Sequence, residues 1–506
     1  MTIGRPVFDV LVVGAGPAGV LAALRAADLG AKTALITRDE FGGMAANDGP
    51  VPVRTLAHAA RLLRDARQVG RYGIALSEPV LDYARLLGRV REVVDDVRAH
   101  STLREHVDRL GVTLYERASA ARFVDAHTIE TEWGLRLQAD KIILCPGGTS
   151  RRLAVPGAEL TATHSDAWSL TAVPPSMLVV GGGATGVQVA SIFRAFGSRV
   201  ELYQAGPRIL ANEDEDVSMA VATALRESGT VVQEDFGTIE SFEKTPDGVR
   251  MHFVKEGVRH QADAALAVVA VGWMADIAGL NLKSAGVETD SRGYVRVDAY
   301  LRTSVPHMFA AGDVTGHPML VPEAIQDAFV AATNAVRGAS TTRGSHVSPI
   351  GSFTNPEYAQ VGLTGAQARK THDVVVAVVR FDETTRTIID GQTAGFCKLI
   401  VDRATATILG CHVVGEQAAE IVQVVAIAIA GGLRVDALAQ VPLSFPTYAG
   451  ILGRAAYRAS EQLHLDVGRR GVPGGGLRDV GLQGGRAADL RGTGTRSNTR
   501  PGKPSP

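Results

Sequence analysis

Hydrophobic and polar positions along this chain follow two different periods, and these periods predict the order of its elements. Residues 10–13 (VLVV) form a short apolar run, which is typical of a buried parallel strand. Residues 20–30 (VLAALRAADLG) follow with a helical pattern, and residues 32–37 (KTALIT) are again strand-like. The chain is therefore predicted to begin with a strand–helix–strand unit.

A stretch interrupted by glycine and proline, residues 41–56, separates this unit from a predicted helix whose apolar positions run from Leu56 to Ala66. Residues 79–111 carry a long amphipathic pattern that predicts one or two helices. Residues 112–148 then alternate like strands and end at a glycine turn.

The strand–helix–strand order returns over residues 176–204, and residues 265–273 add another strand and turn. An apolar strand then ends at Asp313 in a tight glycine turn, and residues 317–338 continue as a helix. From residue 347 to about residue 463 the pattern changes to alternating strands with one strongly apolar helix. This change predicts a separate α+β domain.

Length and composition place the chain among ordinary globular proteins. Its 506 residues are enough for about three domains of ~150 residues each. The formal net charge of -1 provides no overall attraction to nucleic acid or to an anionic membrane. The start of the sequence lacks the apolar region of a signal peptide, and the most apolar late stretch, residues 421–432, is shorter than the ~20 residues of a bilayer span. We therefore expect a cytoplasmic protein with no nucleic-acid partner and no membrane span.

Gly14, Gly16 and Gly19 form a G-x-G-x-x-G motif between the first strand and the first helix. In this motif the first glycine permits a tight turn, the second lets the backbone approach a pyrophosphate, and the third lets the helix pack on the strand. The helix N-terminus adds unpaired N–H groups and a positive dipole end, both of which favour phosphate. The strand and the helix stand on the correct sides, so the motif predicts dinucleotide binding.

A second motif of the same form, Gly181, Gly183 and Gly186, stands between the strand and the helix of the repeated unit. Two such units in one chain indicate dinucleotide binding much more specifically than one unit does. They imply either two dinucleotides or one dinucleotide and its reductant.

The acid that binds ribose is expected about 20 residues beyond the first glycines, at the end of the second strand. Thr37 occupies that position. Asp39 and Glu40 follow closely, and each is a candidate replacement.

Cys145, Cys397 and Cys411 show neither close pairing nor metal-ligand spacing in the sequence. Each lies in an apolar, strand-like run. They are predicted to be small buried hydrophobic residues with free thiols, and no metal site is expected.

With both glycine motifs, the AAGD sequence ending at Asp313 and the pattern of the last domain, the chain resembles the pyridine nucleotide–disulfide oxidoreductases. The resemblance is closest to the lipoamide dehydrogenase, mercuric reductase and soluble transhydrogenase group, and it covers residues from about 7 to 460. It implies an α/β fold with two Rossmann-like dinucleotide-binding domains, for FAD and for NAD(P)H, plus a C-terminal α+β dimerisation domain and hence a homodimer.

The implied domain boundaries are residues 1–155 and 280–345 for the two parts of the FAD domain, 156–279 for the NAD(P)H domain, 346–463 for the dimerisation domain and 464–506 for the tail. The tail is rich in Gly, Arg and Pro with almost no large apolar residues, which predicts disorder.

The resemblance also implies which residues bind the cofactors, FAD and NAD(P)H. The first glycine turn binds FAD, Asp313 hydrogen-bonds the ribityl–phosphate region, and the second glycine turn binds NAD(P)H. The full predicted cofactor-binding set is Gly14, Gly16, Pro17, Ala18, Gly19, Thr37, Arg38, Gly43, Arg54, Gly147, Gly181, Gly183, Ala184, Thr185, Gly186, Gln204, Gly272, Gly312, Asp313, Leu320 and Val321.

Departures from the family pattern concern the thiol chemistry. Members that reduce disulfides or metals carry two cysteines after the first unit, and Ala45 and Pro50 stand at those positions here. The family's C-terminal general-acid His and its orienting Glu are replaced by Phe445 and Gly450. Without a thiolate to protonate, a His–Glu pair has no task, so these losses are mutually consistent.

A Lys near flavin N5 and its Glu partner in the family correspond to Arg54 and Gln188, which we predict to be the catalytic residues. Removing the acid while keeping the cation leaves the flavin facing one more uncompensated positive charge, and arginine does not lose its proton. The alternative interpretation is drift after loss of function.

We interpret the chain as a FAD-dependent NAD(P)H oxidoreductase without the redox disulfide. Reduced flavin would pass electrons directly to a small-molecule acceptor such as a quinone, a dye-like one-electron acceptor or a second pyridine nucleotide. One alternative is a non-catalytic flavoprotein that acts as a binding or structural module. A weaker alternative is a thiol reductase that uses Cys145.

The strand of the second unit ends in Gln204, where an NAD-specific site would place an acid for the ribose hydroxyls. Arg199 and Arg208 lie nearby in sequence. We therefore expect NADPH to be used at least as well as NADH.

Overall fold

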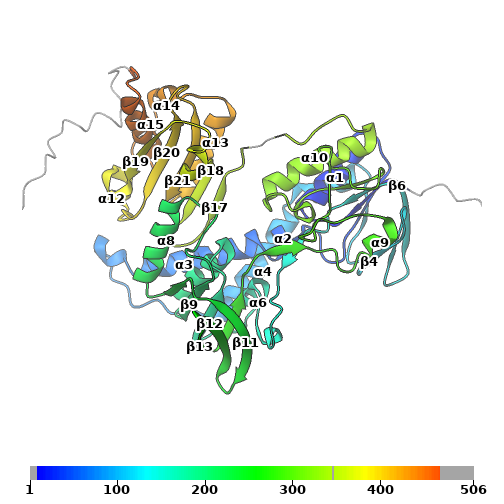
Figure 1. The fold of residues 1–506 in the computed structure, drawn as a ribbon, viewed down its shortest axis with the longest axis horizontal. Helices are drawn as coiled ribbons and strands as arrows, with labels where there is room; N and C mark the ends of the chain where they lie inside the picture. Colours follow the sequence, from blue (N-terminus) through cyan, green and yellow to red (C-terminus); the bar gives the residue numbers. More distant parts are fainter. Residues whose placement is uncertain (1–7, 345–346, 468–506) are drawn as a thin grey trace, which may run out of the picture.

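The computed structural model describes residues 8–344 and 347–467, which form three lobes. Figure 1 shows an N-terminal lobe that the chain leaves and later re-enters, a middle lobe that ends in a long hairpin, and a C-terminal lobe. The predicted tail, residues 464–506, lies outside the described residues from residue 468 onward.

A seven-stranded sheet forms the centre of the N-terminal lobe, in the order β3-β2-β1-β6-β5-β4 with β16 paired to β6. The pairings β2–β3, β1–β2, β1–β6 and β6–β16 are parallel, and β1 is buried except for Asp9 because its apolar residues face layers on both sides. Helices α1 and α10 pack together on one face. The elements are β1 (Phe8–Val13), α1 (Pro17–Asp28), β2 (Thr33–Ile36), α5 (Thr102–Arg109), β3 (Thr113–Tyr115), β4 (Ala121–Asp125), β5 (Thr128–Thr131), β6 (Arg136–Leu144), α9 (Leu282–Ala285), β16 (Met308–Ala310), η3 (Asp313–Thr315) and α10 (Val321–Arg337).

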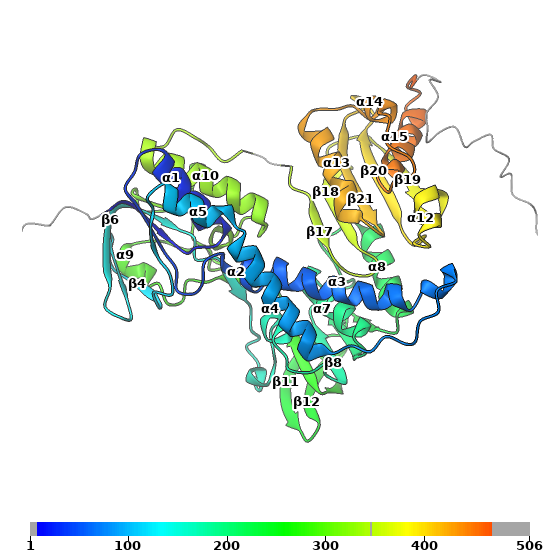
Figure 2. The same cartoon turned by 180° about the vertical axis from the view of Figure 1, so that it is seen from behind.

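The segment between β2 and α5 is more helical than the sequence predicts. It forms α2 (Gly43–Asn47), α3 (Pro50–Ala66), η1 (Val69–Tyr72) and α4 (Tyr83–Ala99). The predicted break over residues 41–56 is therefore wrong from Pro50 onward. Both Pro50 and Pro52 fall in the first turn of α3, where N–H groups have no intrahelical acceptor, so neither ring removes a helical hydrogen bond. Figure 2 shows α3 and α4 side by side between the lobes.

The middle lobe is built on a parallel sheet in the order β10-β9-β8-β14, next to an antiparallel sheet β11-β12-β13. Its elements are η2 (Ala158–Leu160), α6 (His164–Trp168), β8 (Ser176–Val180), α7 (Ala184–Ala195), β9 (Arg199–Gln204), α8 (Glu215–Glu227), β10 (Val231–Glu234), β11 (Thr238–Thr245), β12 (Gly248–Lys255), β13 (Val258–Ala264) and β14 (Leu266–Val269). The strands β7 (Gly148–Ser150) and β15 (Trp273–Ala275) pair where the chain passes between the two lobes.

An antiparallel sheet in the order β17-β18-β21-β20-β19 forms the C-terminal lobe, with α13 and α15 packed on it. The elements are β17 (Ile350–Ser352), β18 (Tyr358–Gly362), α11 (Gly365–Ala368), β19 (Val374–Arg380), η4 (Phe381–Glu383), α12 (Thr385–Ile389), β20 (Phe396–Asp402), β21 (Ile408–Val414), α13 (Ala418–Ala430), α14 (Val435–Gln440) and α15 (Gly450–Gln462). The buried Lys398 on β20 joins this lobe to the middle lobe through hydrogen bonds to Asp214 and Asp216 at the start of α8.

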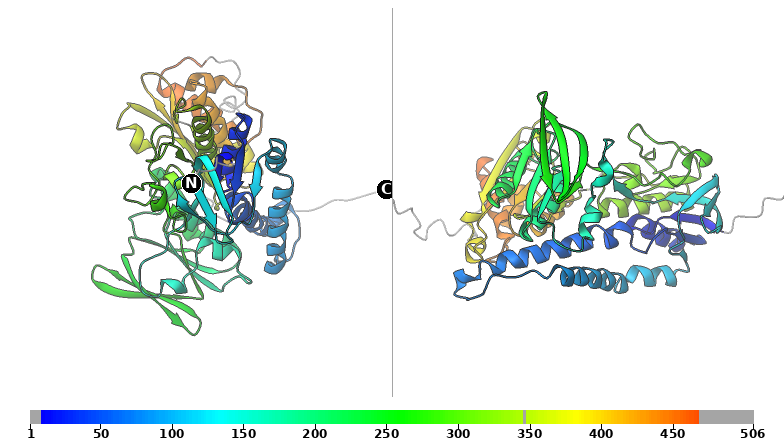
Figure 3. Two further views of the ribbon diagram at one scale, coloured as in Figure 1. Left: turned by 90° about the vertical axis from the view of Figure 1, so that its right-hand side faces the viewer. Right: turned by 90° about the horizontal axis from the view of Figure 1, so that it is seen from below.

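Viewed from below, α3 runs along one side of the molecule from the N-terminal lobe to the C-terminal lobe, as the right-hand panel of Figure 3 shows. Within the described part of the chain, every helix falls short of the length and apolar character that crossing a bilayer requires. The exact domain boundaries stay predictions.

Candidate functional site

Glycine is favoured at the three positions of the first turn for different structural reasons. Gly14 has a φ of 103°, and a Cβ on it would lie 2.0 Å from the carbonyl oxygen of Cys145. A Cβ on Gly19 would lie 1.7 Å from the Gly14 oxygen. At Gly16, in contrast, the nearest atom is 3.9 Å away, the Cα of Gly43. Gly14 and Gly19 are therefore needed for packing, whereas Gly16 leaves open space beside the backbone.

This open space lies at the N-terminus of α1. Gly16 is the N-cap residue, it makes no side-chain capping bond, and Pro17 and Ala18 form the first turn. Uncapped N–H groups and the positive end of the helix dipole both favour a phosphate here. Gly43 closes the other side, because a Cβ on it would lie 2.6 Å from the Gly16 Cα.

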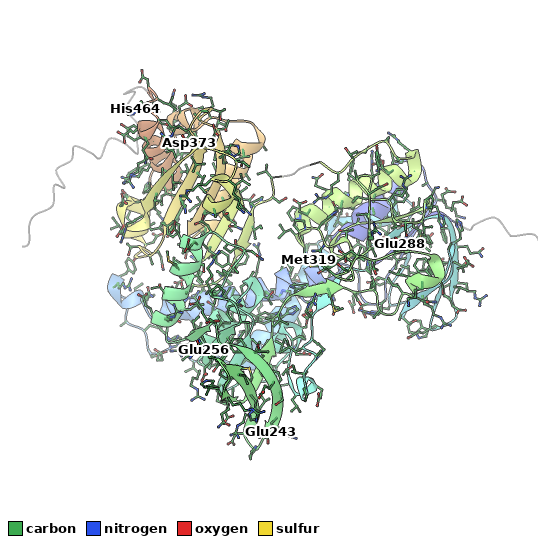
Figure 4. The ribbon with its side chains drawn as sticks, in the orientation of Figure 1. Glu243, Glu256, Glu288, Met319, Asp373 and His464 are labelled. Atoms are coloured by element: carbon green, nitrogen blue, oxygen red, sulfur yellow. The ribbon has the colours of Figure 1, made fainter. Side chains whose placement is uncertain are left out.

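Asp313 lies in the turn after β16, directly after Gly312, and its side chain has no hydrogen-bond or ion-pair partner among the described residues. Burial raises the pKa of this carboxyl. A buried carboxylate without a partner is costly, so a ligand hydroxyl or N–H that donates to Asp313 would be stabilising. Figure 4 places Met319, shortly after this turn, at the edge of the N-terminal lobe that faces the rest of the molecule.

Other predicted cofactor-binding residues lie at the β7–β15 pair and at the start of α10, and Gly148, which the sequence did not single out, lies next to Gly147. Gly148 lies against Asp313, because a Cβ on it would be 3.4 Å from the Asp313 Cβ. Gly147 and Gly272 flank the β7–β15 pair, and neither has an atom within 4 Å of an added Cβ. Leu320 and Val321 form the N-terminal end of α10. Together with the uncapped α1 terminus, the unpartnered Asp313 and the open glycines fit the FAD that the resemblance implies.

A cavity of about 590 Å³ opens beyond the end of β2, where the adenosine end of a dinucleotide is expected. Thr37 itself is buried and continues the backbone pairing with Tyr115. The cavity is lined by Arg38, Asp39, Glu40, Arg117, Ser119, Ala120, Glu132 and Trp133. Of the two candidate ribose acids, Glu40 is held by Arg98 and Arg117, whereas Asp39 pairs only with the exposed Arg38.

The second glycine turn likewise has two crowded glycines and one open glycine. A Cβ added to Gly181 would lie 2.3 Å from the Ala270 oxygen. A Cβ added to Gly186 would lie 1.8 Å from the Gly181 oxygen. At Gly183, the N-cap of α7, no atom lies within 4 Å. The open position of the second turn is again at a helix N-terminus, whose first residues are Ala184 and Thr185.

The strand β9 and the segment after it carry the residues on which the expected use of NADPH rests, and that expectation stays a prediction. Gln204 does lie at the second turn, where its Oε1 accepts the Gly182 N–H at 2.8 Å. Arg199 lies at the opposite end of β9 from this turn. The Arg208 guanidinium donates to the carbonyl oxygens of Leu210, Ala211 and Glu213. Neither arginine is therefore available for a coenzyme 2′-phosphate as the structure stands.

Arg54 on α3 and Gln188 on α7 meet at Phe353, which follows β17. The Arg54 guanidinium lies 3.8 Å from the centre of the Phe353 ring. The Gln188 Oε1 accepts the Phe353 N–H at 3.4 Å, and the Gln188 Nε2 donates to the Ala184 oxygen. Burial lowers the pKa of Arg54, and the charges of Glu420 and Glu357 oppose this shift. No sequence motif indicates Phe353, which is remote from both partners along the chain.

The cysteines are as buried as predicted, but two of them are closer than their spacing suggests. Cys397 on β20 and Cys411 on β21 lie 3.9 Å apart, Sγ to Sγ, because the two strands are antiparallel neighbours. Cys145 lies beneath the first glycine turn, and burial raises its thiol pKa far above the ordinary range.

A polar cluster that sequence reasoning missed lies between the lobes. Asp48 at the end of α2, His164 and Ser165 on α6, and Ser150 on β7 are joined by hydrogen bonds. Three segments of the chain meet there, and no motif in the sequence indicates that they do.

Comparisons with known proteins agree with this geometry. The sequence model of the family described as pyridine nucleotide-disulphide oxidoreductase matches residues 8–328, and that of its dimerisation domain matches residues 348–456. The mercuric reductase of Lysinibacillus sphaericus is 30% identical over 452 residues, which cover 89% of this chain and 82% of the relative. The dihydrolipoyl dehydrogenase of Chlorobaculum tepidum is 32% identical over 466 residues, which cover 90% of this chain and 98% of the relative.

Among solved structures, the HOCl-induced flavoprotein disulfide reductase RclA from Escherichia coli is similar, with a TM-score of 0.79 and 25% identity. The match covers 89% of this chain and 99% of that chain. The predicted α/β fold with a C-terminal dimerisation domain is confirmed, and so are FAD and NAD(P)H as cofactors. The chain therefore belongs to the pyridine nucleotide-disulphide oxidoreductase family and is a FAD-dependent NAD(P)H oxidoreductase.

Proposed function

We propose that this enzyme passes electrons from NAD(P)H through FAD directly to an acceptor that is not a disulfide, such as a quinone or a second pyridine nucleotide. The observation that carries the proposal is the pair Ala45 and Pro50, which stand where thiol-using members of the family carry cysteines. Ala45 lies within α2 and Pro50 begins α3. Neither side chain is able to store electrons or attack a disulfide.

The positions of the three cysteines support the same proposal. Cys145 is buried beneath the first glycine turn, and its raised thiol pKa disfavours the reactive thiolate. Cys397 and Cys411 are fully buried in the sheet of the C-terminal lobe. A thiol reductase that uses Cys145, the weaker alternative from the sequence, is therefore disfavoured.

When bound, FAD would supply the redox chemistry, in which hydride is taken from NAD(P)H and electrons are passed to the acceptor. The chain's contribution is to bind and orient the two cofactors. The α1 N-terminus beside Gly16 binds the FAD pyrophosphate, and Asp313 accepts a hydrogen bond from the ribityl–phosphate region. The α7 N-terminus beside Gly183 does the same for the coenzyme, and Arg54 holds a fixed positive charge near the flavin.

An acceptor screen tests the proposal. The holoenzyme is expected to reduce quinones, ferricyanide or a pyridine-nucleotide analogue with NAD(P)H as donor, and to leave lipoamide and glutathione disulfide untouched. Turnover of either disulfide at a rate comparable to quinone turnover would contradict the proposal. Rapid bleaching of the bound flavin by NAD(P)H separates it from the non-catalytic alternative, which predicts no reduction.

The charge of Arg54 is expected to raise the flavin midpoint potential. A guanidinium that forms no ion pair with a carboxylate among the described residues, although Glu420 and Glu357 act on it from a distance, favours the reduced, more negative form of the flavin. Arg54→Met should lower the potential by about 30 mV or more, which corresponds to ~1.4 kcal/mol for a two-electron couple. Gln188→Glu should lower it more mildly. Dye-equilibrated titration measures both shifts, and Arg67→Met, at the end of the same helix, is the charge-matched control. Equal potentials in Arg54→Met and the parent would mean that Arg54 does not act on the flavin.

Introducing an acid at Gln204 is expected to discriminate against NADPH. The Gln204→Glu variant keeps an oxygen that accepts the Gly182 N–H, but it adds a negative charge where the 2′-phosphate is expected. Like charges in close contact cost several kcal/mol, so kcat/KM for NADPH should fall about tenfold or more while kcat/KM for NADH changes little. Gln233→Glu on the adjacent strand β10 adds the same charge away from the turn. A ratio of the two kcat/KM values that stays constant in Gln204→Glu would place the ribose elsewhere.

The homodimer is proposed to form through the C-terminal lobe. This lobe exposes large apolar side chains, among them Ile427 at 75%, Ile388 at 58% and Phe445 at 53%. Apolar side chains that gather on one exposed domain are typical of an interface. Sedimentation analysis of the holoenzyme is expected to show a dimer, and Ile427→Asp is expected to weaken it.

A further inference from the structure

A hydrogen-bonded chain of four side chains lies beside the FAD-binding residues. The Ser150 Oγ lies 3.0 Å from the His164 Nδ1, and the His164 Nε2 lies 3.4 Å from the Ser165 Oγ. The Ser165 Oγ donates to the Asp48 Oδ2 at 2.5 Å, and this oxygen is also 3.8 Å from the His164 Nε2. We call this set of residues, Ser150, His164, Ser165 and Asp48, the relay.

The two ends of the relay differ in their surroundings. The Asp48 side chain is 35% exposed, so its carboxyl is open to water, whereas the His164 side chain is 5% exposed. Ser150 is half-buried at the end of β7, the strand that begins at Gly148 beside Asp313. The relay therefore connects solvent at Asp48 with the region that holds FAD.

The surroundings of His164 are mostly aromatic. The Trp273 ring lies edge-on at 4.8 Å and the Trp168 ring at 6.5 Å, centre to centre. The charged groups of the described residues that face His164 are Asp48 from α2 and Asp166 from its own helix. Burial lowers the pKa of His164, and these two carboxylates partly oppose the shift. A mostly neutral imidazole at neutral pH is able to take a proton at one nitrogen and release one at the other.

The acceptors under consideration differ in their need for protons. A quinone that accepts a hydride becomes an anionic hydroquinone and must gain one more proton at oxygen, so that two electrons and two protons are taken up in total. A pyridine nucleotide accepts the hydride at carbon and needs no further proton. Ferricyanide accepts single electrons without protons.

Resting on the function proposed above, we propose that the relay delivers the proton that completes acceptor reduction, and that the natural acceptor is a quinone-like compound rather than a second pyridine nucleotide. Ser150 gives its hydroxyl proton to the hydroquinone oxygen and takes the Nδ1 proton of His164. His164 takes a proton at Nε2 from Ser165, whose hydroxyl turns from Asp48 toward the imidazole, and a proton from solvent at the Asp48 end replaces it on Ser165, so that one solvent proton reaches the hydroquinone in total. With Phe445 at the position of the family's general-acid His, His164 is a described imidazole able to deliver a proton to an acceptor oxygen.

The test compares two acceptors in the holoenzyme, 1,4-naphthoquinone and ferricyanide. In His164→Gln, kcat/KM for the quinone is expected to fall about 100-fold, the scale of general acid catalysis, while ferricyanide reduction and stopped-flow reduction of the flavin keep the parental rates. Ser165→Ala, which removes the link to Asp48, is expected to show the same selective loss. Ser169→Ala, which removes a surface hydroxyl beyond the end of α6, is the matched control and is expected to behave like the parent.

A second readout is independent of turnover. In FAD-loaded protein with ¹³C-labelled histidine, one NMR resonance is expected to vanish in His164→Gln. In Asp48→Asn the same resonance is expected to titrate at a lower pH than in the parent, because the carboxylate that favours the imidazolium is gone.

The outcomes separate the relay from the proposed function. Quinone reduction that survives in His164→Gln, or an equal loss for both acceptors, would overturn the relay and leave direct electron transfer standing. A parent enzyme that reduces ferricyanide but no quinone would overturn the quinone-like acceptor together with the relay. A parent enzyme that turns over disulfides would instead overturn the proposed function.

Discussion

The Gly16→Val variant is expected to fold but to be purified without FAD. The protein has room for the larger side chain, because a Cβ added at this position has only the Gly43 Cα near it, 3.9 Å away. The valine Cβ makes only an ordinary van der Waals contact with this atom, and its methyl groups are expected to fill the position where the pyrophosphate approaches the α1 N-terminus. The absorbance ratio at 450 nm to 280 nm and the circular dichroism spectrum measure the two properties separately.

Gly183→Val is the matched control for Gly16→Val, because its glycine has the same open geometry at the second turn. It is expected to keep FAD and to lose saturation by NAD(P)H. Gly19→Ala is the opposite control, since a Cβ 1.7 Å from the Gly14 oxygen is expected to destabilise the fold itself. Full flavin occupancy in Gly16→Val would mean that FAD binds elsewhere.

Removing the guanidinium of Arg343 is expected to destabilise the protein by about 3 kcal/mol or more at pH 7, the scale for breaking a buried ion pair. The Arg343 Nε donates to Asp327 at 2.7 Å, and its Nη2 donates to Glu323 at 2.5 Å. The side chains of Asp327 and Glu323 are only 1% and 7% exposed. Arg343→Met leaves these buried carboxylates with one partner each, His317 and Ser348.

The pH dependence of this loss has a definite sign. Burial disfavours ionised Asp327, but the hydrogen bonds from His317 and Arg343 outweigh it, so the pKa is lowered. A lowered carboxyl pKa contributes stability above the unfolded-state value of ~3.9 and loses it as the pH falls further. The difference between parent and Arg343→Met should therefore persist down to about pH 4 and shrink as the pH falls below it.

Thermal and denaturant unfolding measure the effect of Arg343→Met. The exposed Arg337→Met, on the helix α10 that carries Asp327 and Glu323, is the control, and it is expected to change the free energy of unfolding by no more than ~0.5 kcal/mol. Adding Glu323→Gln to Arg343→Met is expected to restore part of the loss by removing one stranded charge. A parental stability in Arg343→Met would contradict the assignment of this ion-pair network.

Local pattern and glycine geometry were enough to predict most of the fold. The strand–glycine turn–helix units at Gly16 and Gly183 follow from short apolar runs and helical periods, which depend on residues close together in sequence. The start of α3 was predicted wrongly because glycine and proline were interpreted as breaks. Their tolerance in a first helical turn depends on position within the helix, which composition alone does not give.

The parts of the site that escaped prediction are those made by distant segments. Phe353, which joins Arg54 to Gln188, arrives from the C-terminal lobe. His164 and Asp48 meet through the docking of α6 against the end of α2. Single residues carry no periodicity, so such meetings depend on tertiary packing that a sequence pattern does not encode.

An anaerobic titration of the holoenzyme with NADPH determines whether flavin is the sole redox centre. About one hydride equivalent per FAD is expected to bleach the flavin fully, without a thiolate–flavin charge-transfer band. The reduced enzyme should also be insensitive to thiol reagents, because Cys145, Cys397 and Cys411 are buried. Uptake of a second hydride equivalent per FAD, with a long-wavelength charge-transfer band after the first equivalent, would show that flavin is not the sole redox centre.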